Sequence, residues 1–437
     1  MTLTTTDTAH LLLALGSLLV AAHVLGSLFA KFRQPRVIGE ILGGLLLGPT
    51  VLGALAPGAH DWLFPAGGPT PAVLGAVYQL GLLLLLFCSG VEIRSAFNRD
   101  EGKAVASISI AGMVIPFIAG LLALRFVHLE RYWGSAQNST AFLLVFAIAV
   151  AVTSIPVISR IMFDLGILDT AFARIVLGVA VIEDVVLYVV LAIALGLVVG
   201  TGGSDFGLPS LLGLSAGSVA SNAYHVVAAL VVLAMFLIVG PRAYRVVSRS
   251  KLNPVSRSAP VANQLVFMLA ATILCLFLGV TAFFGALLAG IVVGSRRREP
   301  ASAIEAVKTF SFAFFVPVYF AIVGLQLDLI HGFEPLFFLA FLAFACGAKA
   351  ISVFFGARLA GESPRSSLNL AVAMNARGGP GIVLASIAFG AGIISEPFYA
   401  VLVLLAILTS LAAGSWLERI PREQLLARSE SAKPVTS

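Results

Sequence analysis

The sequence predicts an all-α polytopic membrane protein of about 13 transmembrane helices, arranged as an inverted-topology repeat with two broken, crossing helices. Composition, apolar runs and a repeated order of motifs lead to this fold class. Of the 437 residues, 59% are apolar and 11% are charged, whereas a soluble domain averages about 25% charged. So few charges cannot cover the surface of a soluble chain of this length. The composition excludes a soluble enzyme and a nucleic-acid-binding protein, although the net charge is +6.

The apolar runs set the number and the order of the spans. A helix needs about 20 mostly apolar residues to cross a bilayer. Thirteen candidate spans follow: 9–30, 36–54, 71–93, 104–126, 140–163, 171–200, 220–241, 262–279, 282–295, 309–328, 334–359, 366–392 and 395–417. Segment 282–295 is short, so we expect it to be a buried or tilted half-span.

The basic residues indicate the orientation of the chain. If the N-terminus lies outside, the loops on the cytoplasmic side hold 23 of the 27 Lys and Arg residues. Only Arg125 and Arg131 fall on the outer side, and Lys349 and Arg377 lie inside apolar spans. Cytoplasmic loops carry an excess of Lys and Arg. We therefore expect a multi-pass protein with the N-terminus outside and the C-terminus in the cytoplasm.

Three pairs of sequence features recur seven spans apart. The second span carries GEILGGLLLG from Gly39 and the ninth carries GALLAGIVVG from Gly285. The third and tenth spans end in SGVEI and VGLQLDL, and the fifth and twelfth contain TSIP and NARGGPG. Because seven is odd, corresponding spans run in opposite directions, which is the inverted repeat typical of secondary transporters.

The repeat predicts the division of the chain. Residues 1–418 are expected to form one transmembrane domain, with repeat 1 at about 9–200 and repeat 2 at about 262–417. Residues 419–437 are expected to form a short cytoplasmic tail.

The fifth and twelfth spans are predicted to be broken in mid-membrane. Pro156 and Pro380 each remove a backbone donor. Gly378 and the polar Asn375 loosen the twelfth span further. Non-helical backbone is tolerated in a membrane only where it is buried in protein or lines a wet cavity. A broken helix in each repeat therefore points to the binding site.

Four ionisable residues lie near the middle of spans: Glu183, Asp184, Lys349 and Arg377. Each charge at a helix centre costs roughly 2.5–3.5 kcal/mol. They must therefore be paired, hydrated or neutral in part of a working cycle. Lys349 is expected to be the counter-ion of Glu183 or to exchange a proton itself. Arg377 stays charged, so we expect it to organise the broken helix or to bind an acidic partner.

The adjacent carboxylates of Glu183 and Asp184 suit exchange of a proton for a cation. Helix neighbours point about 100° apart, so one acid can face a packed partner while the other faces a cavity. Hard cations prefer oxygen ligands. Thr153, Ser154 and freed backbone carbonyls of the broken span could complete the shell of a monovalent cation at Asp184. A structural ion pair of either acid with Lys349 is the alternative, and the two interpretations are compatible.

Several motifs resemble the monovalent cation:proton antiporters of the CPA2 type. They are QPRVIGEILGGLLLGPTVLG (34–53), LGLLLLLFCSGVEI (80–93), AVTSIPVISRIMFDLGILDT (151–170), TAFFGALLAGIVVGS (281–295) and MNARGGPGIVLASIAF (374–389). They occur in the family's order over nearly the whole chain. The resemblance implies a homodimer with a dimerisation domain and a mobile core domain that alternates access.

The resemblance also implies roles for single residues. The ion-binding aspartate of the family falls on Asp184, its partner acid or amide on Glu183, the membrane lysine on Lys349 and the unwound-span threonine on Thr153. Related proteins usually carry Asp-Asp, Asn-Asp or Gln-Asp where this chain has Glu-Asp. Whether exchange is electrogenic therefore stays open.

Together the residues and the resemblance predict a secondary antiporter that exchanges Na⁺ or K⁺ for H⁺ and contributes to pH homeostasis. We expect no enzymatic activity, no cofactor and no nucleic-acid partner. The expected location is a plasma membrane of the bacterial inner-membrane type. Two alternatives stay open, an organic-anion/sodium symporter and an uncoupled cation channel on a related fold.

Overall fold

The computed structural model describes residues 4–32, 34–95, 102–154, 170–199, 207–213, 219–249, 258–295, 301–330 and 332–420, together with Ile158, Met162 and Ile167. Within these residues the secondary structure is helical, apart from an isolated β-bridge between Trp133 and Ile394. The predicted all-α class is therefore confirmed.

The chain divides into two compact units, and each takes elements from both halves of the sequence. Unit 1 comprises Met1–Phe29, Arg36–Ser95 and Leu195–His331. Unit 2 comprises Ala30–Pro35, Ala96–Ala194 and Gly332–Ser437.

Unit 1 contains the first three predicted spans and those from the seventh to the tenth. Its helices are α1 (Thr5–Lys31), α2 (Arg36–Leu47), η1 (Pro49–Gly53), α3 (Pro57–Leu63), α4 (Thr70–Ser95), α9 (Leu208–Leu211), α10 (Val219–Ile238), α11 (Gly240–Arg249), α13 (Pro260–Phe277), α14 (Ala282–Gly294), α15 (Ala301–Phe310), η3 (Ser311–Phe315) and α16 (Val316–Leu325).

Two close helix pairs of unit 1 depend on glycine. A Cβ on Gly44 of α2 would overlap the backbone of Ala321 in α16. A Cβ on Gly90 of α4 would overlap the carbonyl of Leu287 in α14. Small residues let helix backbones approach in this way. In the predicted repeat α2 corresponds to α14 and α4 corresponds to α16. The α2–α16 contact and the α4–α14 contact are therefore equivalent under the repeat.

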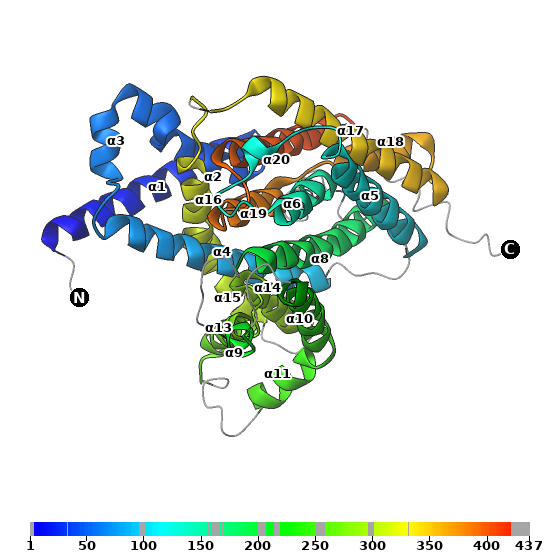
Figure 1. The fold of residues 1–437 in the computed structure, drawn as a ribbon, viewed down its shortest axis with the longest axis horizontal. Coiled ribbons are helices and arrows are strands. Elements are labelled where there is room, and N and C mark those ends of the chain that lie inside the picture. Colours follow the sequence, from blue (N-terminus) through cyan, green and yellow to red (C-terminus); the bar gives the residue numbers. More distant parts are fainter. Residues whose placement is uncertain are drawn as a thin grey trace. The chain divides into compact units, whose positions relative to one another are not determined.

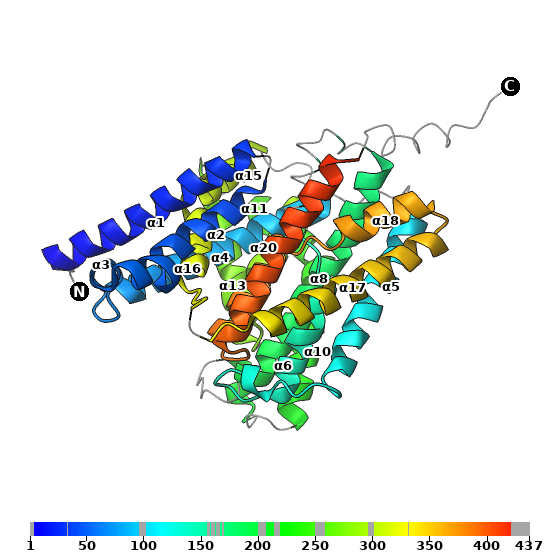
Figure 2. The same cartoon turned by 90° about the horizontal axis from the view of Figure 1, so that it is seen from above.

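Unit 2 holds the remaining predicted spans. Its helices are α5 (Gly102–Ala123), η2 (Glu130–Tyr132), α6 (Ser139–Ala151), α8 (Ala171–Val199, with its last residues in unit 1), α17 (Pro335–Leu359), α18 (Pro364–Ala373), α19 (Gly378–Gly390) and α20 (Glu396–Glu418). In both views α17 runs beside α5 (Figures 1 and 2).

An aromatic cluster joins three helices of unit 2. The ring of Phe398 on α20 lies 5.8 Å from that of Phe146 on α6 and 5.5 Å from that of Phe341 on α17. All three rings are buried. Aromatic pairs at such distances contribute about 0.5–1.5 kcal/mol beyond their burial, so they hold α6, α17 and α20 together.

The loops at one end of unit 2 are tied together by polar contacts. Arg131 Nη2 lies 2.6 Å from Glu334 Oε2, to which the Tyr132 hydroxyl also donates at 3.1 Å. The backbone N–H of Ser395 donates to the Tyr132 carbonyl at 2.9 Å. Burial raises the pKa of Tyr132 to about 12, so the hydroxyl stays a neutral donor at physiological pH. These contacts connect the α5–α6 loop to the starts of α17 and α20.

The number of spans differs from the prediction. Ten helices among the described residues are long and apolar enough to cross a membrane, or up to eleven if α10 and α11, bent by 53°, form one span. The predicted half-span 282–295 corresponds to α14, which has 13 residues. Of the predicted span 140–163 the structure describes α6, also of 13 residues, whereas most of 155–163 lies outside the described residues. The expected count of thirteen is therefore not confirmed.

Candidate functional site

The span predicted at 366–392 is interrupted inside unit 2. Helix α18 ends at Ala373, and α19 begins at Gly378. Gly378 has φ of +29°, where a residue with a side chain would be strained. Pro380 stands in the first turn of α19, where a helix has no intrahelical use for its N–H.

The span predicted at 140–163 leaves its helical course early. Helix α6 ends at Ala151, and Val152 is extended, with φ −70° and ψ 147°. Thr153 and Ser154 follow without regular secondary structure. Pro156 lies outside the described residues, so its part in this break stays a prediction.

The two interrupted segments touch each other directly. The backbone N–H of Ser154 donates to the carbonyl of Ala376 at 2.6 Å. The hydroxyl of Thr153 donates to the carbonyl of Met374 at 2.5 Å. The non-helical residues of each segment thus supply hydrogen-bond partners for backbone groups of the other segment. Buried backbone groups need such partners where water is excluded.

Two buried cations satisfy the C-terminal end of α6. A helix leaves its last four carbonyls without intrahelical partners, and in α6 these belong to residues 148–151. The N–H of Val152 donates to the carbonyl of residue 148 at 3.0 Å. Arg377 donates to the carbonyls of residues 149 and 150 at 3.3 and 3.0 Å. Lys349 donates to the carbonyl of residue 151 at 2.5 Å. Positive charge is favoured at a helix C-terminus, so both cations stabilise this end.

Arg377 is 1% exposed, and all five of its N–H groups have acceptors. Nε donates to Ala149 O, and Nη2 donates to Val150 O and, at 2.9 Å, to Ala345 O. Nη1 donates to the carbonyl and the side-chain oxygen of Asn375 at 3.2 and 3.1 Å. The guanidinium therefore links α6, α17 and the α18–α19 break.

Lys349 on α17 is fully buried and makes three hydrogen bonds. Nζ donates to Glu183 Oε1 at 2.7 Å, to Gly112 O at 2.8 Å and to Ala151 O. Three acceptors match the three donors of an ammonium group. Of the two acids that the sequence left open as partners, Glu183 is the one that this lysine contacts.

Glu183 and Asp184 are each 1% exposed on α8. Their side chains leave the helix about 100° apart, so they meet different surroundings. The Thr153 hydroxyl also lies near Glu183. Ser154 is fully buried, and its Oγ has no hydrogen-bond partner within the described residues. The structure brings Thr153, Glu183 and Lys349 together, and Asp184 follows Glu183 on the same turn.

The carbonyls at the α18–α19 break are already engaged. Every carbonyl oxygen of residues 370–376 accepts a hydrogen bond from a protein donor. Asn375 contributes twice, because its backbone N–H reaches Val372 O and its Nδ2 reaches Ala371 O. Each of these carbonyls thus keeps only its second lone pair for a further ligand. The expectation of freed carbonyls at the fifth span concerns a different segment and stays a prediction.

Two hydroxyl residues that the sequence interpretation missed cap the start of α19. Thr409 Oγ1 accepts from the N–H of Arg377 at 3.4 Å, and Ser410 Oγ accepts from the N–H of Gly378 at 3.1 Å. Both belong to α20 and are buried. Their adjacent polar side chains in an otherwise apolar span were the available signal. Among the described residues, no group of three or more His, Cys, Asp or Glu could hold a metal ion.

Two interrupted helices in direct contact, a buried acid pair and two buried cations with all their donors satisfied are features typical of secondary transporters. The chain belongs to the sodium/hydrogen exchanger transmembrane family, which it matches over residues 17–422. This match confirms the resemblance drawn from the motifs. The chain is therefore a multi-pass membrane protein of a transporter family.

Named relatives are antiporters. The chain is 31% identical to cation/H(+) antiporter 18 of Arabidopsis thaliana, over 90% of this chain and 46% of the relative. It is 27% identical to the Na(+)/H(+) antiporter NhaS4 of Synechocystis, over 95% and 98%. It is 28% identical to K(+)/H(+) antiporter 1 of Saccharomyces cerevisiae, over 90% and 44%. The chain thus spans about half the length of the plant and yeast relatives and nearly all of the cyanobacterial one.

The fold resembles a solved antiporter structure. It superposes on the sodium proton antiporter MjNhaP1 from Methanocaldococcus jannaschii with a TM-score of 0.61, over 96% of this chain and 99% of that one. The sequence identity is 14%, so this likeness concerns the fold, and it confirms the predicted fold class. The two alternatives, an organic-anion/sodium symporter and an uncoupled channel, have no support among these relatives.

Proposed function

We propose that the protein exchanges a monovalent cation, Na⁺ or K⁺, for protons by alternating access. The observation that carries this proposal is the pairing of one of two adjacent buried acids with a buried lysine, because Lys349 lies 2.7 Å from Glu183. We assign the exchange of ions to the neighbouring carboxylate of Asp184, which leaves α8 in a direction about 100° away. The relatives named for Na⁺/H⁺ and K⁺/H⁺ exchange support the same function.

Asp184 binds either the cation or the proton. An ionised carboxylate is a good ligand for a hard cation, and we propose the buried hydroxyls of Ser154 and Thr153 as additional oxygen ligands. The proton neutralises the same oxygens. Because one carboxylate serves both ions, binding of one excludes the other.

The cost of a buried charge makes the exchange coupled. An ionised Asp184 without a bound ion costs roughly 2.5–3.5 kcal/mol in mid-membrane. This cost lowers by about a hundredfold the population of empty transporters that can switch between the two sides of the membrane. The Glu183–Lys349 pair is neutral overall and does not change this balance. Arg377 donates both to the end of α6 and to Asn375 at the α18–α19 break. We therefore expect the two interrupted segments to move together as a rigid body.

The wider setting follows the sequence prediction. We propose inverted repeats at 9–200 and 262–417 within residues 1–418, followed by a cytoplasmic tail at 419–437. The N-terminus lies outside a plasma membrane, the protein forms a homodimer, and its exchange contributes to pH homeostasis. The distribution of Lys and Arg supports the orientation.

Proton flux in liposomes tests the function. The purified full chain is reconstituted with a pH dye inside, a pH gradient is imposed, and Na⁺, K⁺ or Li⁺ is added in turn. We expect at least one cation to collapse the gradient. Asp184→Asn should abolish the collapse, because an amide neither ionises nor takes up the transported proton.

A matched control separates the site from general damage. Asp61 is exposed on α3, so Asp61→Asn makes the same chemical change away from the site and should exchange at the wild-type rate. Cation-dependent exchange retained in folded Asp184→Asn protein would overturn the assignment of this residue. Failure of every cation with the wild-type protein would overturn the proposed function itself.

A further inference from the structure

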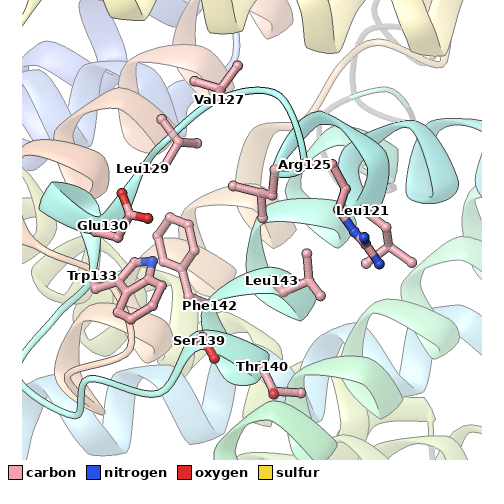
Figure 3. A pocket seen from close by; sticks show the side chains of 11 residues that line it. Leu121, Arg125, Val127, Leu129, Glu130, Trp133, Ser139, Thr140, Phe142 and Leu143 are labelled. Atoms are coloured by element: carbon pink, nitrogen blue, oxygen red, sulfur yellow. The ribbon is translucent and has the colours of Figure 1, made fainter.

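A hollow of about 250 Å³ lies at the end of α5, beside the start of α6 and at the other end of that helix from its break after Ala151. It belongs entirely to unit 2 and is formed by α5, η2 and the start of α6. Figure 3 shows Arg125 on one side and Glu130 and Trp133 on the other, with Phe142 and Leu143 between them. The hollow therefore combines an apolar floor with two opposite charges on its walls.

The two charged side chains have no ion-pair partners among the described residues. Arg125 follows the last turn of α5, and Glu130 opens η2. Both are exposed, and neither takes part in the ion pairs found in the described part of the chain. The neighbouring Arg131, in contrast, pairs with Glu334 at 2.6 Å. Arg125 and Glu130 are therefore free to bind a ligand that carries both signs of charge.

An exposed apolar stripe on α5 leads to the hollow. Ile115, Ile118 and Leu122 are 50%, 47% and 54% exposed, and Phe126 just beyond the helix is 83% exposed. Their spacing of three or four residues places them on one helix face. In a multi-pass membrane protein such a face contacts acyl chains. The hollow thus lies where a lipid chain on α5 would end in its headgroup.

We propose that this hollow binds the headgroup of a zwitterionic phospholipid that carries a primary ammonium. The phosphate receives hydrogen bonds from Arg125, whose planar guanidinium suits phosphate. The ammonium donates to Glu130 and lies against the Trp133 ring, which attracts cations. The acyl chains follow the α5 stripe.

The size and the charges of the hollow exclude other lipids. A volume of about 250 Å³ suits a headgroup and not a whole lipid. An anionic phosphate-glycerol headgroup leaves Glu130 facing negative charge. A quaternary ammonium has no N–H to donate to Glu130. The inference rests on membrane embedding alone and does not depend on the proposed antiport.

Lipid binding to the purified full chain tests the proposal. Native mass spectrometry would compare three dioleoyl lipids with matched chains: phosphatidylethanolamine, phosphatidylcholine and phosphatidylglycerol. We expect the wild-type protein to prefer phosphatidylethanolamine. Arg125→Gln should weaken its binding roughly tenfold, as loss of a charge-assisted hydrogen bond predicts. Glu130→Gln should remove the preference for the ethanolamine over the choline lipid.

Control variants keep the result specific. Arg125→Lys retains the positive charge and should retain most of the affinity. Arg365→Gln and Glu418→Gln change exposed residues elsewhere in unit 2 and should leave binding unchanged. Equal affinity for the three lipids, or unchanged preference in Glu130→Gln, would overturn the proposal. Tighter binding of soluble glycerophosphoethanolamine than of the dioleoyl lipid would overturn the membrane lipid as the source of the headgroup.

Discussion

Replacement of Arg377 by lysine tests how the broken helices are held together. The guanidinium has five N–H groups, and each has an acceptor in α6, α17 or the α18–α19 break. A lysine offers at most three donors and no planar fork. At least two acceptors in a fully buried position therefore lose their hydrogen bonds in Arg377→Lys.

The expected cost follows from these lost hydrogen bonds. A hydrogen bond to a charged group contributes about 1.5–3 kcal/mol, so the loss of two of them in Arg377→Lys should destabilise the protein by about 3–6 kcal/mol. Typical stabilities are about 5–15 kcal/mol. For a unit of about 200 residues, each kcal/mol lowers the Tm by about 2–4 °C. We therefore expect the apparent Tm to fall by at least about 6 °C.

Tryptophan fluorescence during heating at a fixed rate, in one detergent, measures this change. Arg365→Lys is the matched control, because Arg365 is exposed on α18 and should leave the Tm unchanged. An Arg377→Lys protein that melts within 1 °C or so of the control would refute the reasoning. Its acceptors would then be satisfied without the guanidinium.

Three further predictions follow from the packing and from the proposed site. Lys349→Ala should destabilise the protein by about 3–5 kcal/mol because it leaves Glu183 charged and buried. Adding Glu183→Ala should recover part of the lost stability in the same melting assay, and a double variant less stable than Lys349→Ala would contradict the pairing. Gly44→Ala should destabilise because its Cβ overlaps backbone, whereas Gly16→Ala meets nothing within 4 Å and should be neutral or stabilising; equal melting of the two variants would contradict the close contact. The exchange rate should fall as the pH falls because protons occupy Asp184, and a higher cation concentration should restore the rate. Initial rates that fall with pH as much at saturating as at low cation concentration would contradict competition for one site.

The positions of the helices were largely predictable because the bilayer demands long apolar runs. The spans expected at 334–359 and 395–417 appear as Pro335–Leu359 and Glu396–Glu418. The twelfth span was expected to break at its Gly-Gly-Pro motif, and the helix is interrupted between Ala373 and Gly378. In these places the local chemistry alone decides the structure.

The hydrogen bonds of the site were not predictable in the same way. Arg377 and Lys349 bind carbonyls of the α6 terminus, and a carbonyl is present in every residue, so no residue type marks the partners. Their identity depends on how two segments more than two hundred residues apart cross. The pairing of Lys349 with Glu183 was predictable as one of two choices, because a charge in the membrane needs a partner.

Proton release on cation binding tests the central claim most directly, since the claim is that one carboxylate holds either ion. Calorimetric titration of the purified protein with Na⁺ or K⁺, in buffers of different ionisation enthalpy, gives the number of protons released per cation bound. At a pH where the site is protonated, linkage predicts release of about one proton, and Asp184→Asn should bind no cation and release none. Cation binding without proton release in the wild-type protein, or unchanged release in Asp184→Asn, would contradict the account.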